Sequence, residues 1–268
     1  MPVLITGAES GLGAEVMEHL RPTGGELRAY LDATATTEDD AARLRAAGCK
    51  VALGELDDEG HLEAALEQVH TVAHCWTGPL HDPRAQVEAA ATLSSALLGA
   101  GVRRLIWVCE LVRETSNPYL AALSEIRGLF DALPVETVTL STAVRYGAGD
   151  AFTDRLRAGW LSGSGADPAA AHAPINLADV ARAVVVADGQ RGSRRELHVE
   201  LSLVGPEEHT LAAFLDRLGA PGLDAPAPDG MPPPDAWLVD WLSRPASEQA
   251  IPHGAATVAR GADRLGDD

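Results

Sequence analysis

The chain has 268 residues, 46% of them hydrophobic, and a formal net charge of −18. This length and apolar content are enough for a folded core and exclude a disordered chain. The negative charge argues against a nucleic acid or an anionic membrane as partner, because both would repel the chain. The three cysteines are spread singly, which is typical of a reduced cytoplasmic protein and predicts neither disulfides nor a metal site. A charged leader and a long apolar run are absent from the sequence, which favours a cytoplasmic protein without a membrane span.

Short apolar segments alternate with amphipathic segments along the first two-thirds of the chain. The apolar segments predict buried strands over residues 2–6, 26–31, 50–53, 71–75, 104–109, 135–140 and 196–199. The amphipathic segments predict helices over residues 11–20, 37–47, 59–69, 84–100, 121–132 and 177–187. Strands without polar alternation, each followed by a helix, are what a parallel sheet covered on both faces requires. The pattern therefore predicts an α/β fold with a Rossmann-type, doubly wound parallel sheet, and a dinucleotide-binding domain over residues 1–200.

The remaining residues, 201–268, predict a small C-terminal region on the substrate side. Helices are expected over residues 211–218 and 234–242, separated by a Pro-rich link over residues 220–235. The tail over residues 254–268 lacks an apolar face and is expected to be frayed.

The strongest local motif is a glycine-rich turn between the first strand and the first helix. It reads Thr6-Gly7-Ala8-Glu9-Ser10-Gly11-Leu12-Gly13. Gly7 permits a sharp turn, Gly11 lets the backbone approach a pyrophosphate, and Gly13 lets the helix pack closely. Free N–H groups at the start of the helix face bound phosphates, so Glu9, Ser10 and Leu12 join the three glycines as candidate cofactor-binding residues. The alternative is a turn that has lost its ligand.

Asp32 ends the second predicted strand. A carboxylate at this place accepts hydrogen bonds from both ribose hydroxyls of NAD and repels the 2′-phosphate of NADP. The sequence therefore predicts that NAD(H) is favoured over NADP(H). The alternative is a turn residue at the end of a strand, and Arg28 would favour NADP if the strand register shifted.

The pattern Thr-Gly-x-x-x-Gly-x-Gly resembles the short-chain dehydrogenase/reductase superfamily. Further segments, in the same order, resemble its atypical NmrA-like and epimerase-like branch; they span residues 54–58, 72–75, 101–108, 174–181 and 205–210. The resemblance implies that Glu55 and Leu56 flank the adenine. It also implies that His74 lies near the nicotinamide, at the end of the fourth strand.

The same resemblance implies a catalytic Tyr-x-x-x-Lys pair, which this sequence lacks. The residue four places after Tyr119 is Leu123, and the only lysine, Lys50, belongs to the third strand. Cys109 and Glu110 stand where the superfamily has a serine. The standard relay, in which the tyrosine exchanges a proton with the substrate, is therefore absent.

Three groups could replace the missing pair. Tyr119 could polarise a carbonyl as a neutral phenol, although it could also simply pack at a helix start. Glu110 could act as a general acid or base if an apolar pocket raised its pKa, with Cys109 beside it; alternatively it is a solvated loop carboxylate. His74 could face the nicotinamide, or it could be a structural hydrogen-bond partner.

Residues 141–147 resemble the loop that closes over the nicotinamide after the sixth strand. Arg145 and Tyr146 are therefore candidate substrate residues, and a variable substrate loop is expected over about residues 146–173. Trp76, just beyond the fourth strand, could contact the substrate or fill the nicotinamide half of the cleft.

Three functions remain open at this point. The first is an atypical NAD(P)H-dependent oxidoreductase that acts on a small organic substrate with a non-standard proton donor. The second is a non-redox isomerase, dehydratase or cyclase on the same fold, and the third is an NmrA-like regulator that binds the dinucleotide without turnover. A reductase should leave the nicotinamide face open, whereas a cofactor-independent enzyme could keep the glycine turn and fill that half of the cleft. A homodimer is left open.

Overall fold

The computed structural model describes residues 1–76, 82–111, 117–190, 197–228, 230–231, 233–234, 236–243 and 257–260. Its centre is an eight-stranded sheet in the order β12-β10-β6-β5-β4-β1-β2-β3, in which all neighbours run parallel. The strands are β1 (Val3–Thr6), β2 (Leu27–Asp32), β3 (Lys50–Gly54), β4 (Thr71–His74), β5 (Arg104–Glu110), β6 (Glu136–Thr142), β10 (His198–Val204) and β12 (Thr257–Arg260). This sheet confirms the predicted Rossmann-type fold.

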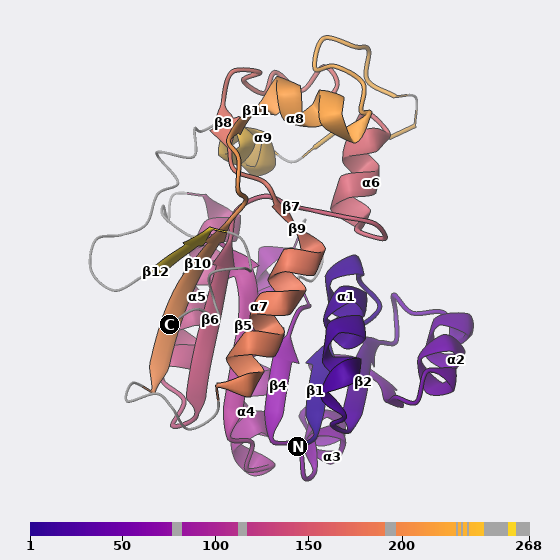
Figure 1. Ribbon diagram of the computed structural model, residues 1–268, viewed down its shortest axis with the longest axis vertical. Coiled ribbons are helices and arrows are strands. Elements are labelled where there is room, and N and C mark those ends of the chain that lie inside the picture. Colours follow the sequence, from indigo (N-terminus) through magenta and orange to yellow (C-terminus); the bar gives the residue numbers. More distant parts are fainter. Residues whose placement is uncertain are drawn as a thin grey trace.

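Helices cover both faces of the sheet (Figure 1). One face carries α1 (Gly11–Leu20), α2 (Glu38–Ala46) and α7 (Leu177–Gly189), and a short 3-10 turn, η1 (Arg21–Thr23), follows α1. The other face carries α3 (Glu59–Leu66), α4 (Pro83–Gly99) and α5 (Pro118–Asp131). Among the described residues, none of the helices has the length and apolar content of a membrane span.

The strands lack polar alternation because each of their faces enters a different core. In β1, Val3 and Ile5 belong to the core under α1 and α7, whereas Leu4 belongs to the core under α3, α4 and α5. Successive side chains of a strand point to opposite faces, so a strand covered on both sides must be apolar throughout.

The strand order reverses beside β1. The chain proceeds from β1 to β2 and β3 on one side, and then crosses back to place β4 on the other side of β1. In open parallel sheets, ligands bind at the carboxyl ends of the strands at such a switch point. The glycine turn lies at this point, immediately after β1.

Beyond the carboxyl ends of the strands, two separate segments form a cap, seen at the top of Figure 1. The cap contains β7 (Arg145–Tyr146), α6 (Ala151–Arg157), β8 (Ala171–His172), β9 (Ile175–Asn176), β11 (His209–Thr210), α8 (Leu211–Leu218) and α9 (Ala236–Leu242). β7 pairs with β9, and β8 pairs with β11. The domain boundary predicted at residue 200 falls within β10, a strand of the central sheet that separates the two cap segments.

The expectation of a frayed tail was wrong for Thr257–Arg260. These four residues form β12, which pairs with β10 at the edge of the sheet. The tail was expected to be frayed because it lacks an apolar face. A short strand at the edge of a sheet does not need such a face; it needs only a neighbouring strand with free backbone groups. The rest of the predicted tail, residues 254–256 and 261–268, lies outside the described residues.

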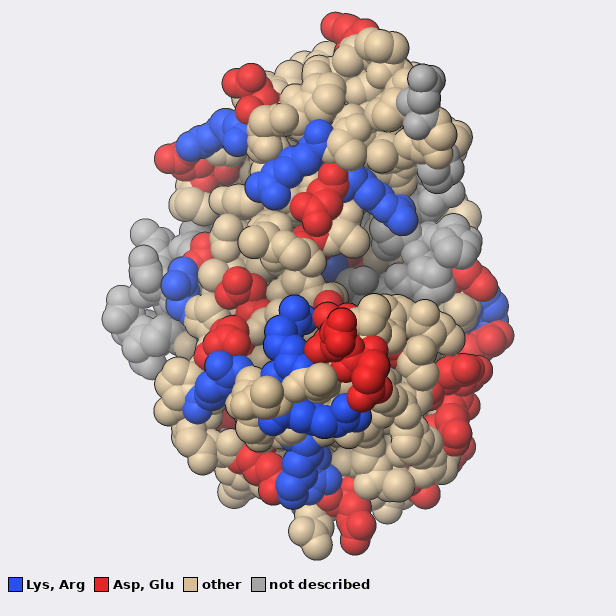
Figure 2. Space-filling view, turned by 90° about the vertical axis from the view of Figure 1, so that its right-hand side faces the viewer, with Lys and Arg blue, Asp and Glu red and all other residues tan. Residues whose placement is uncertain are grey.

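Opposite charges are intermixed on the face seen from the right of Figure 1, where α2 lies (Figure 2). On α2, for example, Arg43 pairs with Asp40 at 3.1 Å and Arg45 pairs with Glu38 at 2.9 Å. The arginines of α2 are therefore matched by neighbouring carboxylates, despite the net charge of −18.

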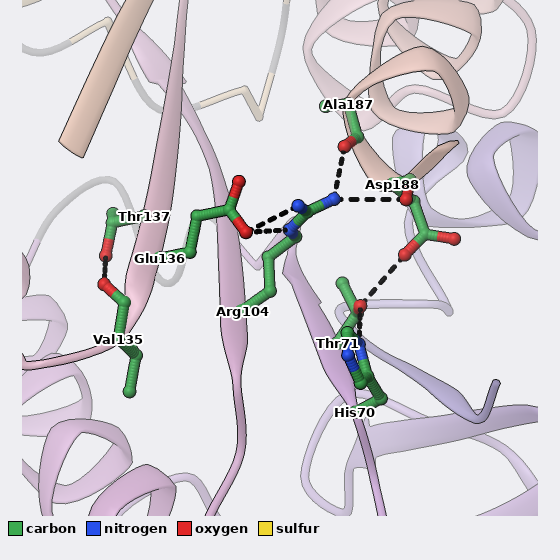
Figure 3. Close-up of polar contacts among 8 residues, drawn as sticks. All are labelled: His70, Thr71, Arg104, Val135, Glu136, Thr137, Ala187 and Asp188. Carbon is green, nitrogen blue, oxygen red and sulfur yellow. Dashed lines mark hydrogen bonds and ion pairs between the residues drawn. The ribbon is translucent and has the colours of Figure 1, made fainter. Parts of the chain in front are cut away.

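At the amino-terminal edge of the sheet, the fully buried Arg104 anchors the end of α7 (Figure 3). Its Nη1 donates to the carbonyl oxygens of Ala187 and Asp188, at 2.7 and 3.0 Å. Its Nε donates to Glu136 at 3.0 Å, and the Asp188 carboxylate accepts from Thr71 Oγ1 at 2.8 Å. A cation at a helix C-terminus stabilises the helix dipole, so this network holds α7 against β4, β5 and β6.

Candidate functional site

The turn between β1 and α1 requires glycine for steric reasons. Gly7 has φ +71°, and a Cβ there would lie 2.7 Å from Trp76 Cα. A Cβ on Gly13 would lie 2.1 Å from the carbonyl oxygen of Gly7. Ser10 caps α1, since its Oγ accepts from the Gly13 N–H at 3.1 Å and donates to the Gly7 carbonyl at 2.7 Å. The first turn of α1, with the N–H groups of Gly11 and Leu12, therefore faces the carboxyl edge of the sheet.

Gly11 has an unexpected neighbour. A Cβ on Gly11 would lie 2.7 Å from both Gly149 C and Asp150 N. Asp150 begins α6 as its N-cap, and its Oδ2 accepts from the N–H and the hydroxyl of Thr153, both at 2.7 Å. The side of Gly11 that the sequence assigns to a pyrophosphate is thus in contact with the chain itself.

Two carboxyl groups meet at the end of β2. Asp32 Oδ1 accepts from the N–H and the hydroxyl of Thr34, at 2.8 and 2.6 Å, so Asp32 does shape the turn. Burial raises the pKa of Glu9 to about 7, and the charge of Asp32 acts in the same direction. Within the described residues, Glu9 Oε2 is buried and has no hydrogen-bond partner. Glu9 is therefore an unusual component of the turn, half protonated near neutral pH.

Of the two residues expected to flank the adenine, Leu56 is buried in the core and the Glu55 side chain is exposed. The Glu55 carbonyl accepts a hydrogen bond from Tyr30 Oη at 3.0 Å. This bond fixes the end of β3 beside β2.

A small cavity lies at the carboxyl ends of β4 and β5, next to α4 and α5. Its volume is about 10 Å³, close to that of one water molecule. It is lined by His74, Trp76, Gln86, Trp107, Val108, Cys109, Glu110, Tyr119, Leu123 and Ile126. Five residues predicted separately from the sequence thus come together, namely His74, Trp76, Cys109, Glu110 and Tyr119. Gln86 was not predicted from the sequence, where its only signal is a polar residue on the buried face of α4.

Glu110 is the centre of a buried polar cluster. Its Oε2 accepts from Tyr119 Oη at 2.8 Å, and its Oε1 accepts a short hydrogen bond from Arg145 Nη2. The side chains of Glu110 and Arg145 are 14% and 12% exposed. Asn117 caps α5 by accepting from the Tyr119 N–H at 3.0 Å, which sets Tyr119 in the first helical turn, earlier than the predicted helix start at residue 121.

This cluster determines the protonation of Tyr119. Burial, together with the Glu110 charge, raises the pKa of Tyr119 well above its usual value, so the phenol stays neutral. Burial works against the charge of Arg145, but Glu110 and the smaller contributions of Tyr119, Asp150 and Cys109 together outweigh it and raise the pKa of Arg145. The Glu110 carboxylate is held in an ion pair, not isolated in the apolar pocket that the sequence analysis envisaged. Tyr119 is a neutral phenol, and its proton is directed at Glu110.

For Cys109 and His74, the structure favours a structural role. Burial raises the pKa of Cys109 to about 12, so the thiol is neither a nucleophile nor a proton donor at neutral pH. Burial lowers the pKa of His74 to about 4, and its Nδ1 shares a 2.7 Å hydrogen bond with Thr6 Oγ1. Tyr146 also packs structurally, with its ring edge-on to Phe214 at 5.7 Å.

Comparison with known proteins gives a family match and a common fold. The model of the NmrA-like family matches residues 2–140. No curated protein matches the chain by sequence.

Several solved structures have a similar fold. The UDP-glucose 4-epimerase of Stenotrophomonas maltophila with bound NAD is 17% identical, with 80% of this chain and 81% of that chain covered and a TM-score of 0.66. The UDP-glucose 4-epimerase of Thermotoga maritima with UDP-glucose is 16% identical, with 86% and 87% covered and a TM-score of 0.65. The Bordetella bronchiseptica enzyme WbmG in complex with NAD and UDP is 20% identical, with 88% and 83% covered and a TM-score of 0.63. At these identities the similarity shows the fold alone.

Proposed function

Because this chain belongs to the NmrA-like family, we propose that it binds NAD(H) and acts as a regulator that responds to the bound dinucleotide without transferring hydride. The glycine turn at the switch point and the fold shared with NAD-bound epimerases support dinucleotide binding. The arrangement around Tyr119 supports the absence of turnover.

The adenosine half of the site fits a dinucleotide. The glycine turn directs the start of α1 towards the carboxyl edge of the sheet. There the free N–H groups of the first helical turn can stabilise a bound pyrophosphate. Asp32 at the end of β2 accepts ribose hydroxyls and repels a 2′-phosphate, which supports NAD(H) over NADP(H). When bound, the nicotinamide ring would supply a site that can carry hydride.

The cap lies against the glycine turn in this conformation, since a Cβ on Gly11 would lie 2.7 Å from Gly149 C and Asp150 N. Binding of the dinucleotide would displace this part of the cap. A protein whose cap moves when NAD(H) binds has the means to report that binding to a partner.

The observation that carries the proposal is the hydrogen bond from Tyr119 to Glu110. Proton donation from Tyr119 to a substrate would create a phenolate beside a carboxylate, with no lysine to stabilise it. Arg145 is already paired with Glu110. The groups at the expected catalytic position thus satisfy one another.

The test is a titration of purified protein with NADH and, separately, NADPH, followed by nicotinamide fluorescence. We expect NADH to bind more tightly than NADPH, and Asp32→Ala to weaken NADH binding while leaving the circular dichroism spectrum unchanged. Thr34→Ala is the matched control for the turn, since it removes only a hydrogen bond to Asp32. If neither dinucleotide binds, the proposal is wrong, and a non-redox reaction in the same cleft becomes the better hypothesis.

One observation favours the alternative of an atypical oxidoreductase on a small organic substrate. Glu110 and Tyr119 line the same cavity, next to Arg145, at the ends of β5 and α5. Bound NADH should be incubated with a panel of aldehydes, ketones and enones while its absorbance is followed. We expect no oxidation of NADH above the rate without protein. Turnover that Tyr119→Phe abolishes would favour the oxidoreductase.

The cytoplasmic location, the small-molecule substrate and a homodimer stay predictions.

A further inference from the structure

Two buried oxygen atoms near the end of β2 lack partners. Within the part of the chain that the structure describes, Glu9 Oε2 and Thr36 Oγ1 have no hydrogen-bond partner. Thr36 belongs to the turn after β2, because its N–H donates to the Asp32 carbonyl at 3.0 Å. Buried polar atoms in folded proteins nearly always have a partner. The first atom belongs to the glycine turn and the second to the turn after β2, so each of the two turns next to Asp32 holds a buried oxygen without a donor.

The charged groups that act on the Glu9 carboxyl are themselves acidic. They are Asp32 at the end of β2 and Asp40 in the first turn of α2. Hydrogen bonds from Thr37 lower the pKa of Asp40, which therefore stays negative. On the side of β4, the neighbour is the Cys75 thiol, whose pKa burial raises to about 12. A negative charge on Glu9 is thus opposed by burial and by carboxylates, while the backbone N–H groups of Glu9 and Asp32 favour it.

We propose that Glu9 carries a proton when the dinucleotide binds, and that this makes Glu9 a specificity-determining partner of the adenosine ribose. The inference rests on the proposed function and deepens it. A neutral carboxyl group both donates and accepts, so it complements the ribose hydroxyls beside Asp32. An ionised Glu9 would instead add a negative charge next to Asp32 and the two charges of the pyrophosphate.

A hydrogen bond between protonated Glu9 and the adenosine ribose has two consequences. Above pH 7, where Glu9 of the free protein is mostly ionised, binding takes up one proton from the solvent, and release of the dinucleotide returns it. A 2′-phosphate would bring still more negative charge against Asp32 and Glu9, so the pair also disfavours NADP(H). The affinity for the dinucleotide, and with it the proposed regulatory response, then depends on pH in the neutral range.

The experiment measures the Kd of NADH by calorimetry at about pH 6.5, 7.5 and 8.5, in two buffers of different ionisation enthalpy. For the wild type we expect the Kd to rise by up to about tenfold per pH unit above 7, with uptake of about one proton at the highest pH. Glu9→Gln should bind with a Kd that hardly changes with pH and without proton uptake. Glu18→Gln is the matched control, since it removes an exposed carboxylate from the same helix and should behave as the wild type.

The outcomes separate this inference from the proposed function. If the wild type binds NADH but takes up no proton, or if Glu9→Gln keeps the wild-type pH dependence, the role of Glu9 is wrong while dinucleotide binding stands. If the wild type does not bind NADH at any pH, the proposed function fails and this inference fails with it. The proton uptake of the wild type needs no variant, so the test remains decisive even if Glu9→Gln does not fold.

Discussion

At the residue scale, burial decides what each ionisable side chain of the site can do. It keeps Cys109 a thiol and His74 neutral, and it keeps Tyr119 a phenol. Glu110 and Arg145 are largely buried too, but they are paired with each other. Glu9 differs from all of these because it is largely buried and faces other carboxylates.

Glu9 should make the stability of the free protein depend on pH. Its pKa is raised in the folded state, to about 7 from 4.5, so the folded protein binds more protons than the unfolded chain between these values. Stability from this group is therefore fully present below pH 4.5 and is lost as the pH rises to about 7. We expect Glu9→Gln to remove this loss and to be more stable than the wild type at pH 8, by about 2–3 kcal/mol.

Urea unfolding at a series of pH values, compared between the wild type and Glu9→Gln, checks this prediction. The difference in the free energy of unfolding should grow between about pH 5 and 7 and then stay constant. A difference that is the same at every pH would show that Glu9 does not titrate in this range.

At the scale of elements, α7 depends on a single buried cation. Arg104 of β5 donates to the last carbonyls of α7 and pairs with Glu136 of β6 (Figure 3). α1 and α7 pack on each other over the same core. Loosening the C-terminus of α7 therefore affects the helix that holds the glycine turn.

Arg104→Met should destabilise the protein by about 3–5 kcal/mol, because it leaves the Glu136 carboxylate and the α7 carbonyls without their partner. Chemical denaturation followed by circular dichroism measures the change. Arg103→Met, at the neighbouring exposed position, is the control and should lie within about 0.5 kcal/mol of the wild type. A small effect of Arg104→Met would mean that water replaces the guanidinium at this edge of the sheet.

At the scale of the whole molecule, the cap and the sheet behave as one packed unit. The core under α4 and α5 continues into the cap through residues such as Trp160 and Phe214. His172 of the cap forms a 2.7 Å hydrogen bond with the Leu242 carbonyl at the end of α9. Under the proposed function, breaking the contact of Gly149–Asp150 with Gly11 costs free energy and lowers the affinity for a dinucleotide.

Asp150→Ala should strengthen NADH binding by up to about fivefold. The change removes the N-cap of α6, worth about 1 kcal/mol, so that less free energy is needed to displace Gly149–Asp150 from Gly11. Asp150→Asn keeps a good cap but removes the charge, and it separates the two effects. The Kd of NADH from fluorescence titration is the measurement; equal Kd values for Asp150→Ala and wild type would show that the segment does not compete with the ligand.

Much of the candidate site follows from the sequence alone. The turn of Gly7 and Gly13 was predictable because a strand, three glycines and a helix in this order have a strong local signature. The lack of a Tyr-x-x-x-Lys pair is likewise visible in the sequence. The bond between Glu110 and Arg145 was not predictable, because it joins residues 35 positions apart and depends on where β7 lies.

The sequence by itself determined the parallel sheet, its helices and the turn at the switch point, since hydrophobic periodicity and glycine sterics act over a few neighbouring residues. Only the tertiary structure decided the cap, because two-residue strands such as β7 and β9 have no periodicity to detect. It also decided that Gly11 lies against Asp150 and that the Glu9 carboxyl is largely buried near Asp32. Contacts and burial of this kind depend on packing between segments far apart in the chain, which no local pattern encodes.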